Sequence, residues 1–247
     1  MAKLNWLMRP IAHRGLHDAA RGIVENTASA IQAAIDAGYA IEIDVQEAGD
    51  GAAMVFHDST LDRLTQASGP VGAYSSKQLK RIKFKGVSDR FQTLPEVFEQ
   101  VAGQVPVIVE IKSDWRARGR FEAQLAQHFN SYDGHAAVMS FDPNAIAAFA
   151  SHAPGIARGL IADPFRNLQY WGHLSAWQRF YMRHLFTTPI ARPHFVAYDI
   201  AGLPSLAPAI WRLLTNRTLL TWTVRSDAEH ARAQRWADAM IFEGFRP

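Results

Sequence analysis

The 247-residue sequence contains no cysteine. Disulfide bonds, zinc–thiolate sites and catalysis by a thiol are therefore excluded, and a reducing, cytoplasmic location is expected. No run of about 18 apolar residues is present, so a membrane-spanning helix is not expected. The N-terminal stretch MAKLNWLMRPIAHRG is interrupted by Arg9 and Pro10, and its apolar part is too short for a secretory signal.

Neither sign of charge dominates the composition. Lys and Arg number 26 and Asp and Glu 23, which gives a net charge of +3 and a pI near 9.3. This mild excess suits a phosphate-bearing small molecule but is too weak to indicate nucleic acid. Hydrophobic residues make up 48% of the chain, and α/β barrels of about 250 residues are commonly single domains. Because no linker divides the sequence, we expect one domain over residues 1–247.

Short apolar runs with the composition of strands alternate with helical patterns along the chain. They lie at residues 9–13, 40–45, 52–57, 106–112, 136–141, 157–162, 194–200, 219–224 and 238–243. This alternation predicts a parallel α/β barrel of the TIM (β/α)8 type. One joint breaks the pattern, because EAGDG is too short for a crossover helix and Asp50-Gly51 favours a hairpin. We therefore expect a distorted barrel or an extra strand, and leave the strand direction over 45–52 open.

Two stretches depart from the strand–helix repeat. Residues 58–92 follow the third strand, include the basic run KQLKRIKFK, and are expected to form a small insertion with a solvated helix face. Residues 163–193 include YWGHLSAWQRFYMRHLF, which is rich in aromatic and basic residues. The favoured interpretation is a helix that covers the barrel. A lid, or an interfacial patch that contacts a membrane surface, is the alternative.

Polar residues gather at the predicted carboxyl ends of strands, where barrels of this type carry their function. They are His13 and Arg14, Glu42 and Asp44, His57 and Asp58, Glu110 and Lys112, and Trp222. Glu42 and Asp44 are spaced i, i+2, as are Glu110 and Lys112, so the two residues of each pair lie on one face of their strand. A solvated edge strand explains one such pair, whereas convergent carboxylates need a cation among them. All-oxygen ligands favour Mg²⁺ or Ca²⁺ over zinc, and the sequence does not choose between these two.

His13 and His57 occupy consecutive strand ends, and each is followed directly by a charged residue. A single histidine is more often a packed or surface residue. Two at such positions suit an acid/base pair, because imidazole gains and loses a proton near neutral pH. The other histidines lie in helical or loop contexts and are interpreted as structural or surface residues.

A set of motifs in fixed order closely resembles the glycerophosphodiester phosphodiesterase family over nearly the whole chain. The motifs are HRG at 13–15, ENT at 25–27, IEIDV at 41–45, VFHD at 55–58, L-x-R-x-T at 61–65, TLPEV at 93–97, VEIK at 109–112, SFDP at 140–143 and WTV at 222–224. The resemblance implies a TIM-type barrel of the phospholipase-C-like phosphodiesterase group. It also implies one divalent metal, held by Glu42, Asp44 and Glu110.

The same resemblance implies roles for the remaining site residues. His13 and His57 would be general acid and base, and Arg14 and Lys112 would contact the phosphate. Asn26 lies in the ENT motif and is expected to line the site, although a helix cap is an equally good role for it. Trp222 would pack against the glycerol carbons, with ordinary core packing as the alternative.

The implied reaction is the metal-dependent hydrolysis of a small glycerophosphodiester to an alcohol and glycerol 3-phosphate. The substrate's own glycerol hydroxyl would attack, and water would open the resulting cyclic phosphate. The alternative within enzymes is a lysophospholipase D or sphingomyelinase D-like reaction on a lipid, with the aromatic segment in contact with acyl chains. A non-catalytic binding barrel would not need all these groups, and a glycosidase would leave Arg14, Lys112 and both histidines unused.

Two positions depart from the family pattern. Arg225 follows WTV where the family often has Asn, and Glu243 occupies the place of a customary Asp. Neither change removes a predicted metal ligand or a catalytic histidine, so they bear on substrate choice rather than on catalysis. The head group, the identity of the first-step acid and the oligomeric state are not indicated by the sequence.

Overall fold

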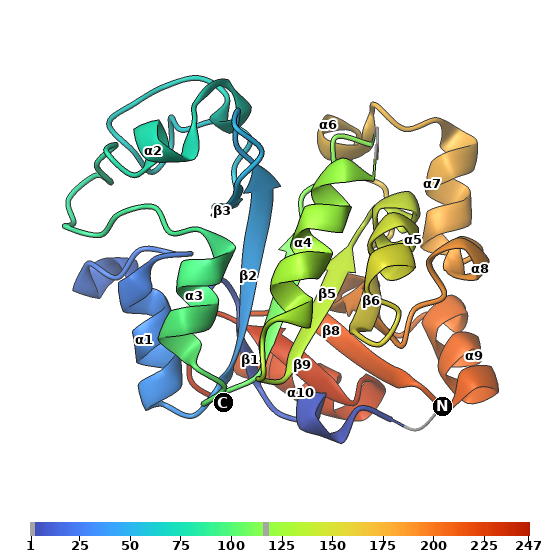
Figure 1. The fold of residues 1–247 in the computed structure, drawn as a ribbon. Coiled ribbons are helices and arrows are strands. Elements are labelled where there is room, and N and C mark those ends of the chain that lie inside the picture. The colour runs from blue at the N-terminus through green and yellow to red at the C-terminus, as the bar shows by residue number, and fades with distance from the viewer. Residues whose placement is uncertain (1–2, 116–118) are drawn as a thin grey trace.

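A closed barrel of eight parallel strands forms the centre of the protein. The computed structural model describes residues 3–115 and 119–247. The parallel strands are β1 Ile11–Ala12, β2 Ala40–Glu47, β4 Val107–Ile111, β5 Ala136–Ser140, β6 Ala157–Ala162, β7 Phe195–Asp199, β8 Thr218–Val224 and β9 Ala239–Phe242. Neighbouring strands pair in this order, and β1 closes the ring by pairing with both β2 and β9 (Figure 1). The predicted TIM-type barrel is confirmed.

The extra strand is β3, Ala53–Val55, which pairs antiparallel with β2. A tight turn joins the two strands, and in it the Gly51 N–H donates to the Ala48 carbonyl at 2.9 Å. Gly51 has a φ of +87°, which glycine adopts without a steric penalty. The hairpin predicted at Asp50-Gly51 is therefore confirmed, and it explains why EAGDG needs no crossover helix.

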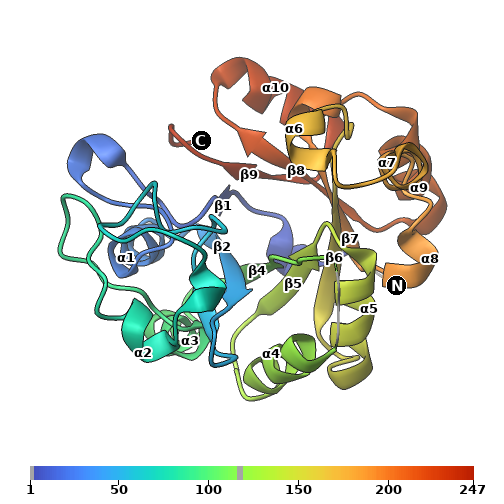
Figure 2. The same ribbon diagram turned by 90° about the horizontal axis from the view of Figure 1, so that it is seen from above.

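Helices surround the strands, as the view along the barrel shows (Figure 2). The α-helices are α1 Ala28–Asp36, α2 Ser76–Leu79, α3 Leu94–Val101, α4 Arg120–Asn130, α5 Pro143–His152, α6 Leu168–Trp171, α7 Ala176–Arg183, α8 Thr188–Ala191, α9 Leu206–Thr215 and α10 Asp227–Trp236. Short 3-10 turns are η1 Asn5–Leu7, η2 Ala19–Arg21, η3 Val71–Ala73 and η4 Ile200–Gly202. The capping boxes Ser75–Gln78 and Thr93–Glu96 begin α2 and α3.

The alternation of side chains along β2 and β4 decides which face is inside the barrel. Ile41, Ile43 and Val45 pack into the apolar layer between the strands and the helices. Ala40 packs instead into the barrel interior, together with Ile108 of β4. Because successive side chains point to opposite faces, the residues that follow Ala40 and Ile108 at two-residue intervals also point inward. The carboxylates of both strands therefore face the interior, and the solvated-edge interpretation is wrong.

The insertion at residues 58–92 has a small apolar cluster of its own. In this cluster Phe84 and Phe91 lie 4.9 Å apart between ring centroids, and Phe56 lies 5.0 Å from Phe91. The predicted helix face over KQLKRIKFK is only partly correct, since α2 ends at Leu79. Phe84 does not lie on a solvated helix. It forms an antiparallel bridge with Thr65, and its side chain is 1% exposed and packs in the cluster.

The aromatic stretch at residues 163–193 also differs from the single covering helix that we expected. It forms three short helices, α6, α7 and α8. Met182 and Leu185 pack into the core, whereas Tyr170 and Trp177 are about 70% exposed, at 71% and 69%. The segment thus covers the barrel with only one side and leaves large aromatic rings in solvent.

Candidate active site

Three carboxylates converge inside the carboxyl-terminal end of the barrel. Glu42 and Asp44 come from β2 and Glu110 from β4, and the strand register places Asp44 directly beside Glu110. One oxygen of each group lies within 4.8 Å of an oxygen of both others. Glu42 and Asp44 are 1% exposed and Glu110 is 9% exposed. The residues that the sequence singles out as a metal-binding set are therefore brought together.

The electrostatics of this cluster are unbalanced. Burial, and then the charges of Asp44 and Glu110, raise the pKa of Glu42 well above its usual value. Burial also raises the pKa of Glu110. Burial acts in the same direction on Asp44, but Lys112, His57 and Arg14 outweigh it and hold the pKa of Asp44 below its usual range. At the two glutamates the nearby positive charge does not offset the effect of burial, and both pKa values stay raised.

Two cations contact the cluster. Lys112 Nζ lies 2.8 Å from both Asp44 Oδ1 and Glu110 Oε1, and Arg14 Nε lies 3.4 Å from Asp44 Oδ2. The buried Oε1 of Glu42 has no hydrogen-bond partner among the described residues. Three carboxylates with two cations and an orphaned buried oxygen fit a divalent cation. An all-oxygen donor set of this kind suits a hard cation.

The HRG turn after β1 places Arg14 over the carboxylates. The Arg14 N–H donates to Glu42 Oε2 at 3.0 Å, and the Gly15 N–H donates to the Glu42 carbonyl at 3.1 Å. Gly15 has a φ of +77°, and a Cβ there would lie 2.8 Å from the backbone carbonyl carbon of Ala30. Only glycine fits this close approach to α1, which explains the residue type at this place.

His13 is held by the carboxylate of Glu243, the residue that directly follows the last strand, β9. Ala12 of β1 pairs with Phe242 of β9, so the residues that follow them, His13 and Glu243, are neighbours. His13 Nδ1 lies 2.5 Å from Glu243 Oε2, and its Nε2 lies 3.9 Å from Glu42 Oε2. Burial lowers the pKa of His13, and the hydrogen bond to Glu243 offsets this only in part.

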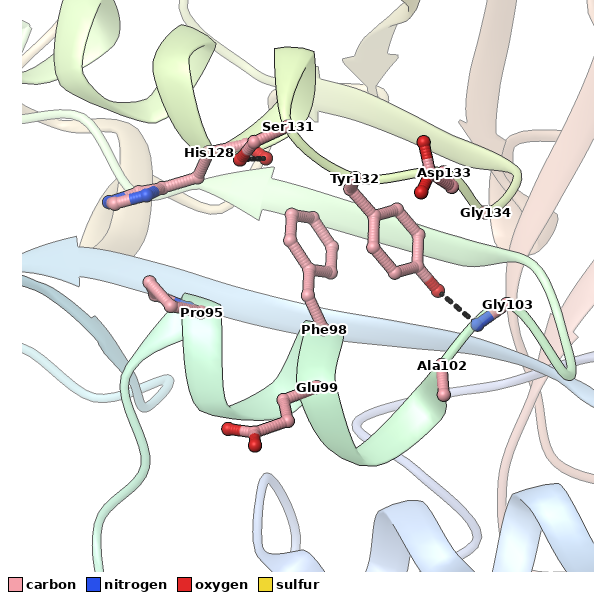
Figure 3. A pocket seen from close by; sticks show the side chains of 10 residues that line it. All are labelled: Pro95, Phe98, Glu99, Ala102, Gly103, His128, Ser131, Tyr132, Asp133 and Gly134. Carbon is pink, nitrogen blue, oxygen red and sulfur yellow. Dashed lines mark hydrogen bonds between the residues drawn. The ribbon is translucent and has the colours of Figure 1, made fainter.

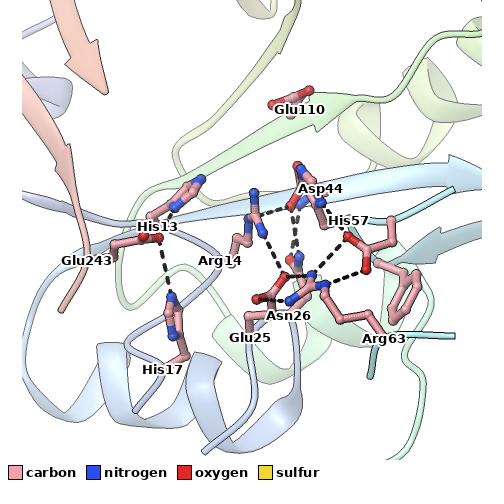
Figure 4. A network of polar contacts seen from close by, with 12 residues as sticks. His13, Arg14, His17, Glu25, Asn26, Asp44, His57, Arg63, Glu110 and Glu243 are labelled. Atoms are coloured by element: carbon pink, nitrogen blue, oxygen red, sulfur yellow. Dashed lines mark hydrogen bonds and ion pairs between the residues drawn. The ribbon is translucent and has the colours of Figure 1, made fainter. Parts of the chain in front are cut away.

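Glu243 has two further basic partners. Arg225 Nε lies 2.5 Å from Oε1. His17 Nε2 lies 3.6 Å from Oε2 (Figure 4). Burial would raise the pKa of Glu243, but the hydrogen bond with His13 and the nearby His17 and Arg225 outweigh it and hold that pKa below its usual range, so the group is ionised. The two departures from the family pattern, Arg225 and Glu243, therefore contact each other. His17, interpreted from the sequence as a structural or surface residue, belongs to this group.

His57 is held in a parallel way by its neighbour. Its Nδ1 lies 2.8 Å from Asp58 Oδ1, and Arg63 binds Asp58 through Nε at 2.6 Å and Nη2 at 2.9 Å. The same guanidinium donates to both oxygens of Glu25, at 2.7 and 3.0 Å. Glu25 also accepts from Arg14 Nη1 at 2.7 Å (Figure 4). Arg63 thus links His57, through Asp58, to Arg14, through Glu25.

Asn26 does not cap α1. The cap is Thr27, whose hydroxyl accepts from the Ala30 N–H at 3.4 Å. Asn26 is 1% exposed; its Nδ2 donates to Asp44 Oδ2 at 2.8 Å, and its Oδ1 accepts from the Asp44 N–H at 3.2 Å. The helix-cap interpretation is wrong because the chain turns at Asn26, with a φ of +57°, and directs the amide towards β2.

Trp222 lies on β8 at the same end of the barrel and is partly exposed. Its Nε1 donates to the Ala197 carbonyl at 3.1 Å, and its ring meets Phe141 edge-on at 5.4 Å between centroids. Phe141 in turn lies 4.9 Å from Trp171 of α6. A row of aromatic rings therefore leads from the site to the segment at residues 163–193.

Comparison with known proteins gives a consistent result. The sequence pattern of the "Glycerophosphoryl diester phosphodiesterase family" matches residues 13–244. The chain belongs to this family. A glycerophosphodiester phosphodiesterase of Caldanaerobacter subterraneus is 33% identical over 161 residues, 61% of this chain and 65% of that relative. A putative member from Bacillus subtilis is 28% identical, over 69% of this chain and 72% of the relative. The aligned region thus covers just under two thirds of the first relative.

Solved structures of family members have the same fold. A phosphodiesterase of Oleispira antarctica, in complex with the product sn-glycerol-3-phosphate, covers 98% of this chain with a TM-score of 0.79 and 20% identity, and 95% of that structure is matched. The glycerophosphodiester phosphodiesterase of Thermotoga maritima covers 94% of this chain, with a TM-score of 0.69 and 22% identity, and 93% of it is matched. These likenesses confirm the barrel architecture.

The sequence assigned no specific role to Glu25, Asp58, Arg63 and Glu243, although Asp58 was noted at a strand end, and it placed His17 outside the site. The first three lie inside motifs shared with the family, ENT, VFHD and L-x-R-x-T, so a signal was present. Their spacing says nothing about which histidine or arginine they contact. Glu243 gave a weaker signal, because its link to His13 depends on the register between the first and last strands.

A separate groove lies between α3 and the end of α4 (Figure 3). Its walls come from α3 with the turn after it and from the last residues of α4 with the turn that follows. Phe98 and Tyr132 stack there at 4.2 Å, and the Tyr132 hydroxyl accepts from the Gly103 N–H at 3.0 Å. None of the carboxylates and histidines of the candidate site lines this groove.

Proposed function

We propose that the protein hydrolyses glycerophosphodiesters to an alcohol and glycerol 3-phosphate, with His13 and His57 as the acid/base pair. The observation that carries this proposal is the matched pair of carboxylate–histidine contacts beside the buried carboxylates. Each contact engages Nδ1 and leaves Nε2 of its ring for proton exchange with substrate. The family to which the chain belongs, and the product bound in the Oleispira antarctica relative, support this substrate class.

The proton transfers follow from these contacts. One histidine removes the proton from the attacking glycerol hydroxyl of the substrate, and the other donates a proton to the departing alcohol. A cyclic phosphate results, and the two roles reverse when water opens it. Glu243 and Asp58 fix the orientation of their histidines through the contacts with Nδ1.

Positive charge around the phosphate comes from several sources. We propose that Arg14 and Lys112 contact the phosphate oxygens while remaining tethered to Glu25, Asp44 and Glu110. Glu42, Asp44 and Glu110 would hold a divalent cation. When bound, this cation would neutralise the charge that develops on the phosphate. Asn26 would act by orienting Asp44, since its amide is already engaged there.

A second candidate function is the same reaction on a lysophospholipid. The row of rings from Trp222 through Phe141 to Trp171 favours it, because such a row offers an apolar path for an acyl chain. In the first candidate, Trp222 packs only against the glycerol carbons of a small substrate. The two candidates share all the residues that act on the phosphate.

The two candidates are separated by a panel of substrates. Purified protein is incubated with Mg²⁺ or Ca²⁺ and with glycerophosphocholine, glycerophosphoethanolamine or lysophosphatidylcholine. Release of glycerol 3-phosphate is followed by a coupled assay, and release of choline or ethanolamine is measured separately. We expect turnover of the small diesters. Turnover of lysophosphatidylcholine alone would contradict the first candidate and support the second.

Chelation tests the proposed metal site. We expect EDTA to abolish turnover and Mg²⁺ or Ca²⁺ to restore it. The metal should also raise the melting temperature, since a ligand at about 100 times its dissociation constant stabilises the folded state by about 2.7 kcal/mol. Glu110→Gln should reduce this thermal shift, while Glu99→Gln, in the separate groove, should leave it unchanged. An enzyme indifferent to EDTA, with no thermal shift, would contradict the metal proposal.

A further inference from the structure

Exposed apolar side chains concentrate on one part of the molecule. Among the described residues, twelve large apolar side chains are exposed, and all except Met8 lie between Leu168 and Leu214. The exposed apolar side chains of this range lie on α6, α7, α8 and α9 and, for Phe186, on the turn after α7. Scattered apolar residues on a surface need no explanation, but a contiguous group indicates an interaction site.

The α9 helix presents an apolar stripe to solvent. Leu206, Ile210, Leu213 and Leu214 are 80%, 51%, 82% and 78% exposed. Their spacing of i, i+4, i+7 and i+8 places them on one face of the helix. The opposite face is packed against the barrel through Trp211, which is 9% exposed. This helix is therefore apolar on both its buried and its exposed side.

Exposed aromatic rings continue the apolar surface over α7 and the turn after it. Trp177, Phe180 and Tyr181 are 69%, 45% and 50% exposed, and Phe186 is 56% exposed. Phe180 contacts each of the other three, at 6.0 to 6.2 Å between ring centroids. These rings form a surface cluster instead of packing into the core.

The helices that carry these side chains lie along one side of the barrel. In Figure 1, α7, α8 and α9 follow one another down the right-hand side, and α6 lies at the upper end. The view in Figure 2 agrees, with α7 above α9 on the same side. We call the exposed apolar residues of α6 to α9, from Leu168 to Leu214, the apolar face.

Charge in this part of the chain is mainly positive. Residues 163–217 contain six arginines (166, 179, 183, 192, 212 and 217) and two carboxylates, Asp163 and Asp199, and one of the arginines, Arg212, is paired with Asp238. Two copies joined symmetrically through the apolar face would bring one arginine-rich surface against another. A partner with negative charge and an apolar interior complements the face better.

We propose that the apolar face docks the protein on the surface of a membrane that contains anionic lipids. Trp, Tyr and Leu side chains beside arginines are the composition of interfacial membrane-binding helices. Among the described residues, no helix is long and apolar enough to cross a bilayer. The contact is therefore peripheral, with α7 and α9 inserted at the level of the lipid headgroups. This proposal does not depend on the reaction proposed above.

Vesicle binding tests the docking surface. The whole protein is sedimented with vesicles of phosphatidylcholine alone or mixed with phosphatidylglycerol. We expect binding to the mixed vesicles, weakened by added salt. The double variant Leu213→Gln/Leu214→Gln should bind the vesicles at least about tenfold more weakly. Burial of two leucine side chains in the membrane contributes more than the 1.4 kcal/mol that corresponds to a tenfold change in affinity. Met8→Gln, an exposed apolar residue outside the apolar face, should bind like the unchanged protein.

Two controls make the result decisive. The double variant should keep its melting temperature and its turnover of soluble glycerophosphocholine, since Leu213 and Leu214 are exposed and outside the active site. Equal binding by the variant, or no preference for the anionic vesicles, would overturn the proposal. A dimer in solution that the variant converts to a monomer, without vesicle binding by either protein, would identify the face as a contact between copies and would also overturn it.

Discussion

At the scale of single residues, His13 and His57, the proposed acid/base pair, are held in the same way by different segments of the chain. Each uses Nδ1 to bind a carboxylate, and each carboxylate is held by an arginine. The chain Arg225–Glu243–His13 comes from the end of the barrel, whereas Arg63–Asp58–His57 comes from the insertion. The two groups come from separate segments. A substitution in one group therefore leaves the contacts within the other group unchanged.

Replacing either histidine tests the acid/base assignment. We expect His13→Ala and His57→Ala each to lower kcat by about 10²- to 10⁴-fold, since a positioned proton donor or acceptor contributes this much. The melting temperature should change little, because both residues lie at the strand ends and not in the apolar core. His152→Ala, an exposed residue at the end of α5, should retain full turnover. Near-normal kcat in either active-site variant would refute the assignment.

Arg63 is expected to act as a positioning residue, because its guanidinium binds Asp58 and Glu25 at once. Lysine keeps the charge but cannot hold two carboxylates in this forked geometry. Arg63→Lys should therefore lower kcat by about tenfold or more through misplacement of His57, with a smaller effect on the melting temperature. Arg90→Lys is the matched control from the same insertion, since Arg90 binds the backbone carbonyls of Ser88 and Asp89. An equal loss of kcat in both variants would contradict the positioning role.

At the scale of elements, the turn after β1 ties Arg14, the proposed phosphate contact, to the start of α1. The Leu16 N–H donates to the Ala30 carbonyl at 2.9 Å, and the Asn26 N–H donates to the Arg14 carbonyl at 2.9 Å. The helix and the turn therefore pack as one unit, with Gly15 at the closest point between them. This unit determines where Arg14 points.

Comparison of Gly15 with Gly38 distinguishes the effect of backbone strain from the effect of a clash with the Cβ atom. Gly15 has a φ of +77° and no room for a Cβ, whereas Gly38, at the end of α1, has a φ of +72° and nothing within 4 Å. Alanine at Gly38 should cost about 1 kcal/mol of stability through backbone strain, and alanine at Gly15 should cost more, because the clash with Ala30 adds to the same strain. Only Gly15→Ala should also lower turnover, since it pushes the HRG turn away from α1. Measurement of melting temperature and kcat for both variants checks this, and full activity in Gly15→Ala would contradict it.

At the scale of the whole molecule, Asp238 joins three parts of the chain where the barrel closes. It lies before β9, is 3% exposed in its side chain, and binds Lys3 Nζ at 2.8 Å and Arg212 Nη2 at 2.5 Å. Its other oxygen accepts from the Leu219 N–H of β8 at 2.9 Å. Burial would raise the pKa of Asp238, but the Leu219 N–H, Lys3 and Arg212 outweigh it and hold the pKa below its usual value.

This contact predicts an acid-dependent part of the stability. Because the pKa is lower in the folded than in the unfolded protein, the contribution is present above about pH 4, the unfolded pKa, and is lost as pH falls further through the folded pKa. Asp238→Asn should lower stability at pH 7 by about 1 to 3 kcal/mol. Urea unfolding of both proteins from pH 7 to pH 3 should show the difference shrinking at low pH. A difference that stays constant, or one equal to that of the exposed Asp133→Asn, would contradict it.

The sequence predicted much of the fold because its signals are local. Alternating side chains and capping residues such as Thr93 mark elements within a few residues of one another, and Asp50-Gly51 marks a hairpin by itself. Errors arose where tertiary packing overrides a local pattern. The run after Leu79 is basic enough for a solvated helix, yet Phe84 is drawn into the core of the insertion. The possible helix cap at Asn26 lies one residue too early: Thr27 caps α1, and the Asn26 amide binds Asp44 of β2 instead.

The sequence by itself determined that Glu42 and Asp44 share a strand face, that Glu110 accompanies them and that a histidine follows each of two strands; the expectation that these strand ends are consecutive is wrong, because β2 lies between β1 and β3. Side-chain alternation and motif order carry that information without reference to the rest of the chain. Only the tertiary structure decided that this face is the barrel interior, that Asp44 lies beside Glu110, and that Glu243 holds His13. The reason is physical: strand register and ring closure depend on contacts between segments up to 230 residues apart. No local spacing encodes them.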